Sequence, residues 1–140
     1  VILQECVEGA ENGDVRIMML NGEPIGAMRR VPSKDDVRSN IHAGGKEVKH
    51  SLTKEEKKLC KYIGPQLVRD GLFFVGLDVI SGKLIEVNVL SPGGITRINR
   101  LNRVKLQRQV IDFAESIVQA KEMVASRKNE FRQVIDNAVM

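Results

Sequence analysis

The sequence predicts an α+β fold, in which an antiparallel sheet carries packed helices. Two pairs of apolar stretches are each separated by a two-residue turn signal, Asn21-Gly22 and Ser81-Gly82, which is typical of hairpins. One run with helical spacing lies between these pairs, and a longer run follows the second pair. The chain has 140 residues, 42% of them hydrophobic and 29% charged, which is enough for one domain with a packed core.

The first third of the chain is expected to contain the first hairpin. Residues 1–7 have the composition of a short buried strand, and residues 8–14 that of a polar turn. Strands are predicted over 15–20 and 25–30, on either side of the first turn signal. Residues 31–52 show neither a helical nor a strand period, which predicts a long functional loop.

A capping box is predicted to start the first helix. The Thr53 hydroxyl can accept a hydrogen bond from the amide of Glu56, while the Glu56 carboxylate reaches back to the start of the helix. Gly71 is placed to end this helix, and Pro65 predicts a kink or two short helices that meet near Gly64. The predicted apolar face of the helix consists of Leu59, Cys60, Ile63, Leu67 and Val68.

The second hairpin and a long helix are predicted for the rest of the chain. A nearly continuous apolar strand covers 72–80, its partner covers 83–90, and residues 91–94 form a turn. From about Asn99 onward the apolar residues recur at helical spacing, more thinly toward the end.

Composition argues against several classes of function. The net charge of +4 is too small to make nucleic acid the expected partner, and no stretch approaches the ~20 apolar residues of a membrane span. Cys6 and Cys60 lie far apart with no CxxC motif or nearby histidine pair, which predicts reduced cytoplasmic thiols and no zinc site.

Three oxygen-bearing side chains of the second hairpin are candidate metal ligands. Asp78 stands inside an otherwise hydrophobic strand, and Glu86 and Asn88 alternate with valines on its partner. Side chains two residues apart in a strand share a face, so Glu86 and Asn88 point the same way. An all-oxygen set of this kind suits Mg²⁺, which proteins commonly hold by carboxylates together with substrate phosphates.

The hairpin register decides whether Asp78 joins this set. A two-residue turn pairs Ile80 with Lys83 and puts Asp78 on the other face of the sheet. A three-residue loop pairs Ile80 with Leu84, and Asp78 then lies opposite Glu86. In the second register a divalent cation would offset the repulsion between the two carboxylates. The alternative is that both carboxylates are solvated on the exposed face of an edge hairpin.

Arginines at the first hairpin are candidate anion ligands. Arg16 opens one strand, Arg30 closes the other, and Arg38 follows in the predicted loop. Guanidinium groups suit bidentate contacts with phosphate or carboxylate oxygens, and Gly44-Gly45 adds backbone amides that an anion can approach closely. With the carboxylates, they suggest a nucleotide polyphosphate between metal and arginines. The alternative is a solvated basic surface.

Three motifs in this order resemble those of a known family. They are GDVR at 13–16, the R-x-N-x-x-x-G-G loop at 38–45, and the GLD…E-x-N hairpin at 76–88. Over residues 1–118 the chain resembles the C-terminal portion of bacterial-type glutathione synthetases, which belong to the ATP-grasp superfamily. The resemblance implies an ATP-grasp C-terminal lobe over 1–118, followed by a helical extension over 119–140.

The resemblance also implies an activity. It is an ADP-forming ligation in the cytoplasm, in which ATP phosphorylates the carboxylate of γ-glutamylcysteine and glycine attacks the acyl phosphate. The implied cofactors are ATP and two Mg²⁺ ions, with Mn²⁺ as a substitute. The implied metal ligands are Asp78, Glu86 and Asn88.

Further site residues follow from the same resemblance. Arg16 and Arg30 would stabilise the acyl phosphate, and the catalytic candidate Arg38 would lie in the loop that closes over it. Other members of that loop would be Asn40, Gly44 and Gly45. The nucleotide-binding residues would be Glu5, Cys6, Val7 and Asp14, and the residues that border the peptide substrate would be Ser91, Gly93 and Gly94.

Two features depart from the family pattern. The segment after the E-x-N strand more often contains Thr-Ser-Pro-Thr, whereas residues 90–94 read Leu-Ser-Pro-Gly-Gly, so the acid and amine substrates stay open. The chain begins at Val1 without the substrate-binding domain or the small ATP-grasp lobe, so we expect these 140 residues alone to be inactive. The alternatives are another ATP-grasp peptide ligase or a non-catalytic binding module, and a homo-oligomer is possible in either case.

Overall fold

The computed structural model describes residues 5–32 and 45–138. Three site predictions, those for Arg38, Asn40 and Gly44, therefore lie outside the described residues, as do the first four residues of the strand predicted over 1–7. The chain divides into two compact units, Val1–Leu106 and Gln107–Met140, which are described separately below.

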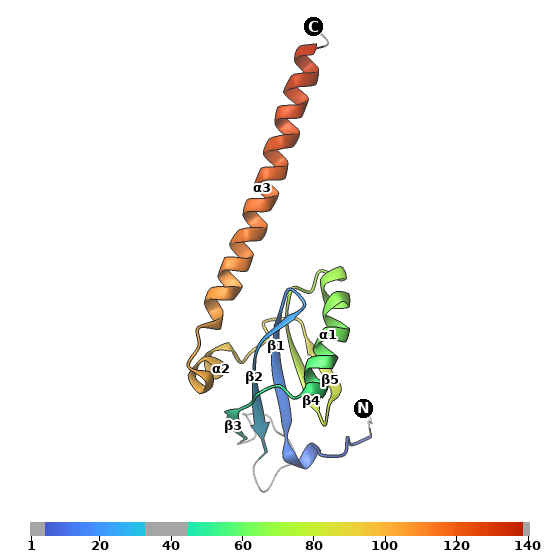
Figure 1. Cartoon of the computed structure of the whole chain (residues 1–140), viewed down its shortest axis with the longest axis vertical. Coiled ribbons are helices and arrows are strands. Elements are labelled where there is room, and N and C mark those ends of the chain that lie inside the picture. Colours follow the sequence, from blue (N-terminus) through green and yellow to red (C-terminus); the bar gives the residue numbers. More distant parts are fainter. Residues whose placement is uncertain (1–4, 33–44, 139–140) are drawn as a thin grey trace. The chain divides into compact units, whose positions relative to one another are not determined.

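The first unit is built on a five-stranded antiparallel sheet (Figure 1). Its order is β3-β2-β1-β4-β5, so β1 is the central strand and β3 and β5 form the edges. The strands are β1 (Asp14–Leu20), β2 (Glu23–Val31), β3 (Lys46–Lys49), β4 (Phe74–Ile80) and β5 (Lys83–Asn88). The predicted α+β class and both predicted hairpins are confirmed.

The second hairpin has the register in which Asp78 lies opposite Glu86, but its turn differs from the one predicted for that register. The turn is the two-residue Ser81-Gly82, with Ile80 opposite Lys83, so the three-residue loop considered for this turn is wrong. A register shift between Asp78 and Val79 then adds one residue to β5, and Asp78 lies opposite Glu86. A β-bulge of this kind inserts one extra residue on one strand. It therefore puts Asp78 and Glu86 on the same face of the sheet, whereas the two-residue turn alone would have put them on opposite faces.

Two parts of the N-terminal half differ from the sequence prediction. Residues 5–7 are not part of a strand, and a short 3₁₀ helix, η1 (Ala10–Asn12), lies within the predicted polar turn. Strand β3 lies inside the segment predicted to be a loop and pairs with β2, Arg30 opposite Glu47. Its sequence, KEVK, is too short and polar to indicate a strand, which forms because the edge of β2 offers hydrogen-bonding partners.

Helix α1 (Lys54–Arg69) begins at the predicted capping box. Glu56 N donates to Thr53 Oγ1 at 3.2 Å, and Thr53 N donates to the Glu56 carboxylate at 2.8 Å. The helix is one element with Pro65 inside it, so the predicted division into two helices is wrong. Gly71 follows the helix end with a φ of 75°, the left-handed conformation that glycine adopts readily.

The C-terminal helical region contains two helices. α2 (Ile95–Asn102) begins four residues before the predicted start, and Arg103 ends it in the left-handed conformation. α3 (Leu106–Ala138) follows. The sequence was predicted to form one helix because its apolar residues recur at helical spacing throughout. This spacing does not reveal that the backbone at Arg103 turns to the left-handed conformation and separates α2 from α3.

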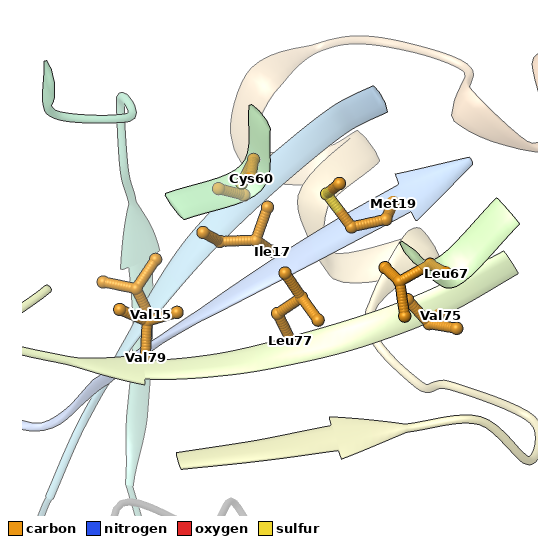
Figure 2. Close-up of a cluster of buried hydrophobic side chains, with 9 residues drawn as sticks. Val15, Ile17, Met19, Cys60, Leu67, Val75, Leu77 and Val79 are labelled. Carbon is orange, nitrogen blue, oxygen red and sulfur yellow. The ribbon is translucent and has the colours of Figure 1, made fainter. Parts of the chain in front are cut away.

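Each face of the sheet is covered by a different helix. The larger core joins β1 and β4 to α1 through residues such as Ile17, Leu77 and Cys60 (Figure 2). The other face joins Met18 and Met28 to Ile98 of α2 and to Leu106. Because side chains alternate along a strand, the even-numbered residues of β1 face the α2 side.

The second unit consists of the greater part of α3. From residue 107 to residue 138 its side chains are exposed or partly exposed. Among the residues that the structure describes, no helix is both long enough and apolar enough to cross a membrane. The structural division falls after Leu106, while the boundary predicted at residue 118 stays a prediction.

Candidate functional site

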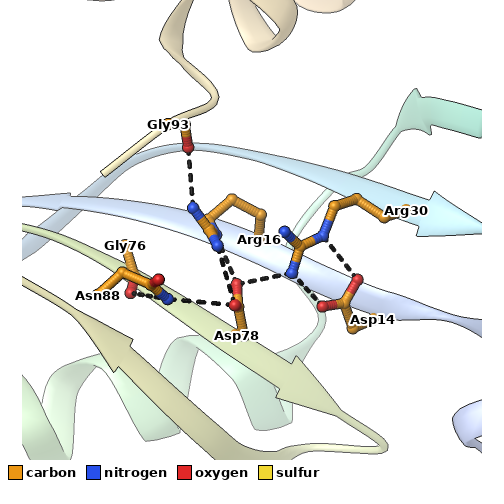
Figure 3. A network of polar contacts seen from close by, with 7 residues as sticks. All are labelled: Asp14, Arg16, Arg30, Gly76, Asp78, Asn88 and Gly93. Atoms are coloured by element: carbon orange, nitrogen blue, oxygen red, sulfur yellow. Dashed lines mark hydrogen bonds and ion pairs between the residues drawn. The ribbon is translucent and has the colours of Figure 1, made fainter. Parts of the chain in front are cut away.

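The central strand β1 places two charged residues on the α2 side of the sheet. Asp14 lies opposite Arg30 of β2, and Arg16 lies opposite Asp78 of β4. These four side chains form a buried charge network at one end of the sheet (Figure 3). Each residue is between 5% and 7% exposed.

Asp78 is the centre of the charge network. Its Oδ1 accepts hydrogen bonds from Arg16 Nε at 2.5 Å and from Arg30 Nη2 at 3.0 Å. Its Oδ2 accepts from Arg16 Nη2 at 2.9 Å and from Asn88 Nδ2 at 3.1 Å. Both oxygens are therefore occupied by donors, two of which form the bidentate arrangement that a guanidinium favours.

Asp14 holds the second arginine. Arg30 donates to Asp14 through Nε at 2.8 Å and also through Nη2. Burial by itself lowers the pKa of Arg30, but its hydrogen bonds and charge interactions with Asp14 and Asp78 outweigh burial and raise that pKa above its usual value. Arg30 is thus a permanent cation, and two arginines balance two aspartates in the network.

A loop approaches the network from the end of β5. Arg16 Nη1 donates to the carbonyl of Gly93 at 2.9 Å, and Gly94 lies against the Arg16 side chain. Gly76 makes room for Arg16, because a Cβ at Gly76 would lie 3.2 Å from both Cδ and Nη1 of that side chain. Arg30 uses only Nε and Nη2 for its partners among the described residues, which leaves Nη1 as a donor for an anion (Figure 3).

The other predicted site residues lie at varying positions around this network. Glu86 is exposed and lies opposite Asp78 across the hairpin, so the predicted convergence of these two residues is present in the strand register. Ser91 is exposed at the start of the 91–94 segment, and Gly45 directly precedes β3. Among the described residues, the network's hydrogen bonds involve none of Glu5, Cys6 and Val7.

Sequence reasoning missed two sets of ion pairs. Asp14 was assigned to the nucleotide, and in the structure it also pairs with Arg30. The two-residue turn alone would put Asp14 opposite Arg29, and a register shift between Met18 and Met19 brings Arg30 to that place. Glu47 of β3 forms an ion pair with Arg97 of α2 and a longer one with Arg100, at 3.4 Å. No sequence signal indicates this second link, because β3 was not recognised as a strand.

The oxygen atoms of Asp78, Glu86 and Asn88 are a candidate donor set for a divalent cation. Among the described residues, no group of three or more histidine, cysteine, aspartate or glutamate side chains is arranged to hold a metal. The candidate set is therefore two carboxylates and the Asn88 amide oxygen, since the hydrogen bond from Asn88 to Asp78 uses the amide nitrogen. Hard oxygen ligands of this kind suit Mg²⁺, so the residues fit the cation provided that Asp78 releases part of its guanidinium contact.

The family match over residues 1–103 and the antiparallel sheet with its packed helices identify an ATP-grasp lobe of the α+β class. The family profile that matches residues 1–103 is that of the prokaryotic glutathione synthetase ATP-grasp domain. The chain belongs to this family.

Several glutathione synthetases are similar to the chain. The protein from Gloeobacter violaceus is 49% identical over 113 residues, which cover 81% of this chain and 35% of the relative. The protein from Thermosynechococcus vestitus is 49% identical over 79% of this chain and 35% of the relative. The Agrobacterium fabrum protein is 41% identical over 81% of this chain and 36% of the relative. The chain therefore spans about a third of the length of these relatives.

One solved structure also resembles the chain. It is the ATP-grasp ligase PsnB complexed with a minimal precursor, which is 17% identical and aligns with a TM-score of 0.44. The alignment covers 63% of this chain and 28% of that chain.

Proposed function

We propose that this chain is the C-terminal ATP-grasp portion of a cytoplasmic glutathione synthetase. The complete enzyme would use ATP to join γ-glutamylcysteine and glycine, with release of ADP. The observation that carries the proposal is the family match over residues 1–103, whose charged motif residues Arg16, Arg30, Asp78 and Asn88 meet in one network. Small molecules are therefore the proposed substrates.

The arginines are proposed to bind the reacting phosphoryl group. Arg16 and Arg30 are buried and held in place by two aspartates, so their positive charges need little reorganisation when an anion arrives. Arg30 Nη1 is a free donor among the described residues, and Arg16 can turn from Asp78 toward the same anion. The two side chains would then stabilise the negative charge of an acyl phosphate and keep it in position for attack.

The acidic side of the network is proposed to hold the cation. Asp78, Glu86 and Asn88 would hold two Mg²⁺ ions together with the nucleotide phosphates, and Mn²⁺ could replace Mg²⁺. A bound cation would neutralise part of the negative charge of the phosphates. The chain's own contribution is the rigid hairpin, whose bulge puts Asp78 and Glu86 opposite each other.

The remaining residues receive roles by position. The 91–94 segment, through the Gly93 carbonyl on Arg16, would place the peptide substrate beside the network. The segment 5–7 is proposed to line the adenine, together with Asp14 near the ribose. Arg38, Asn40, Gly44 and Gly45 are proposed to form the loop that covers the acyl phosphate.

Nucleotide binding tests the metal assignment. The chain is titrated with ADP in the presence and absence of Mg²⁺, and we expect Mg²⁺ to strengthen binding. In the Glu86→Gln variant, the strengthening of ADP binding by Mg²⁺ should be at least about 10-fold smaller, because one carboxylate ligand is gone. Glu86 is exposed, so we expect this substitution to leave the fold intact. Glu115→Gln, on the exposed surface of α3, is the matched control and should bind as the unaltered chain does. Unchanged Mg²⁺ dependence in Glu86→Gln would remove Glu86 from the metal site.

Activity tests the ligase assignment. The unmatched part of the Gloeobacter violaceus relative is fused upstream of this chain, since the chain spans only a third of such proteins. We expect the fusion to release ADP when γ-glutamylcysteine and glycine are both present, and Arg16→Met to abolish this release. Release of ADP with a different amine but not with glycine would contradict the glutathione assignment and retain the ligase class.

A further inference from the structure

A cavity of about 410 Å³ lies against α2, next to the charge network. Gly94 lies against the Arg16 side chain, and the carbonyl of Gly93 accepts a hydrogen bond from Arg16 (Figure 3). The cavity is lined by Gly94, Thr96, Arg97 and Arg100. Both charged residues of this lining are arginines, so the cavity favours an anion.

A carboxylate from β3 holds both arginines of the cavity in place. Arg97 and Arg100 lie three residues apart on α2, so their side chains project from the same face of the helix. Glu47, whose side chain is 9% exposed, forms an ion pair with Arg97 Nε and accepts a hydrogen bond from Arg100 Nη2 at 3.4 Å. Arg97 uses only Nε for its partner among the described residues, which leaves both of its Nη groups as donors for an anion.

Glu47 also connects the cavity with the arginines of the charge network. It lies opposite Arg30 on the neighbouring strand, and Arg30 lies opposite Asp14 on the next one. Residues that lie opposite each other share a face of the sheet, and neighbouring strands are about 5 Å apart. Since Arg97 reaches Glu47 from α2, its guanidinium group lies on the order of 10 Å from that of Arg30.

We infer that Arg97 and Arg100 bind the second carboxylate of the peptide substrate, an inference that rests on the proposed function. γ-Glutamylcysteine has two carboxylates, of which one is phosphorylated beside Arg16 and Arg30. The other belongs to the γ-glutamyl residue and does not react. Seven bonds separate the two carboxylate carbons, or about 9 Å in an extended conformation, which matches the spacing of the two arginine groups.

The charge of the cavity fits a carboxylate better than a phosphate. Glu47 neutralises one of the two guanidinium groups, so one positive charge remains for the ligand. A carboxylate carries one negative charge and accepts two parallel N–H bonds from a guanidinium group. Arg97 and Arg100 would therefore select a peptide that has a carboxylate at its far end.

Two dipeptides that differ by this carboxylate provide a matched test. γ-Glutamylcysteine carries it, and 4-aminobutanoyl-cysteine is the same molecule with a hydrogen atom in its place. Both dipeptides keep the amino group, the thiol and the reacting carboxylate. A difference in their binding therefore measures the contribution of the second carboxylate.

NMR spectroscopy of the ¹⁵N-labelled whole chain measures binding without catalysis. We expect γ-glutamylcysteine to shift the amide signals of residues 94–100 and the Arg97 Nε–H signal, with saturation by about 10 mM. It should bind about 30-fold more tightly than 4-aminobutanoyl-cysteine, because hydrogen bonds between charged groups are lost with the carboxylate.

Substitutions of the two arginines test the contact from the side of the protein. Arg97→Gln and Arg100→Gln should each weaken binding of γ-glutamylcysteine about 10-fold and change binding of the analogue less than about 3-fold. The Arg100 side chain is 76% exposed, so its replacement should leave the fold intact, which a circular dichroism melt checks. Arg108→Gln on the exposed surface of α3 is the matched control and should bind both dipeptides as the unaltered chain does.

Kinetics of the fused enzyme distinguish failure of this contact from failure of the proposed function. In the fusion, Arg97→Gln should raise the KM for γ-glutamylcysteine about 10-fold and change kcat less than about 3-fold, because the contact is the same before and during the reaction. If the unaltered fusion releases no ADP, the proposed function is wrong, and the NMR titration still decides whether the cavity binds the carboxylate.

Three results would overturn the inference. Signals of residues 94–100 that do not move with γ-glutamylcysteine up to about 10 mM would mean that the cavity does not bind it. Equal affinity of the unaltered chain for the two dipeptides would exclude a contact with the second carboxylate. Equal loss of both dipeptides in Arg97→Gln would mean that Arg97 supports the local fold and does not recognise the carboxylate.

Discussion

The substitution Gly64→Ala sets helix propensity against close packing. Gly64 lies inside α1, where alanine is intrinsically favoured over glycine by about 1 kcal/mol. In the structure, however, α1 passes directly over the turn between β1 and β2. A Cβ at Gly64 would lie 2.2 Å from the Gly22 carbonyl oxygen, a distance that real Cβ atoms do not reach, and 3.1 Å from the Gly22 carbonyl carbon, which is a tight contact.

The expected sign is therefore destabilisation. The obstacle is backbone on the turn side, so no side chain can rotate away, and the helix must move off the sheet. Overpacking of this kind costs about 3 kcal/mol, at the upper end of the usual range, and the gain in propensity offsets about 1 kcal/mol of it. The free energy of unfolding should fall by about 2 kcal/mol and the melting temperature by about 8 °C.

Urea unfolding followed by circular dichroism measures this difference. Gly93→Ala is the matched control, since nothing lies within 4 Å of a Cβ there and the backbone is not left-handed. Its free energy of unfolding should stay within about 0.5 kcal/mol of the unaltered chain. If Gly64→Ala proves as stable as the control, or more stable, the close contact between α1 and the turn is wrong.

Three further substitutions or conditions probe the same unit. Asp78→Asn should lower the free energy of unfolding by about 3 kcal/mol in urea titrations, because buried Arg16 loses its counter-charge and Arg30 loses one of two, while Asp112→Asn on exposed α3 should leave it unchanged. Thr53→Ala should cost about 1 kcal/mol through loss of the helix cap, with Thr53→Ser retaining most of the stability; equal losses in both would exclude the hydroxyl as the cause. Burial raises the pKa of the Cys60 thiol from 9.0 to about 11, so a thiol reagent should label exposed Cys6 quickly and Cys60 only on unfolding. Because the folded state holds this proton more tightly, the contribution of Cys60 is complete below pH 9 and is lost by pH 11, a change of about 3 kcal/mol that Cys60→Ala should remove.

Much of the fold follows from local signals in the sequence. Thr53 and Glu56 start α1 as a capping box, and Asn21-Gly22 closes a hairpin, because each signal depends only on residues a few positions apart. Strand β3 and the break at Arg103 could not be predicted. The first depends on the free edge of β2, and the second is a single residue in a left-handed conformation.

The candidate site was predictable in its members and less so in its pairing. Periodicity places Arg16 on one strand and Asp78 on another, but only the order β2-β1-β4 brings them face to face. The pairing of Asp14 with Arg30 depends instead on the register shift between Met18 and Met19 in the first hairpin. Long-range strand order is the information that local patterns lack.

The bulge in the second hairpin shows how one residue controls the site. Turn geometry alone, with Ile80 opposite Lys83, would send Asp78 and Glu86 to opposite faces of the sheet. The extra residue in β5 reverses this parity, so that Asp78 lies opposite Glu86 and Asn88 donates to the Asp78 carboxylate at 3.1 Å. A β-bulge disturbs the strand ladder locally, and its presence beside the charge network is consistent with a role in aiming ligands rather than in stabilising the sheet. The same carboxylate pairs with Arg16, so the proposed binding of a cation at this site would exchange one partner of Asp78 for another.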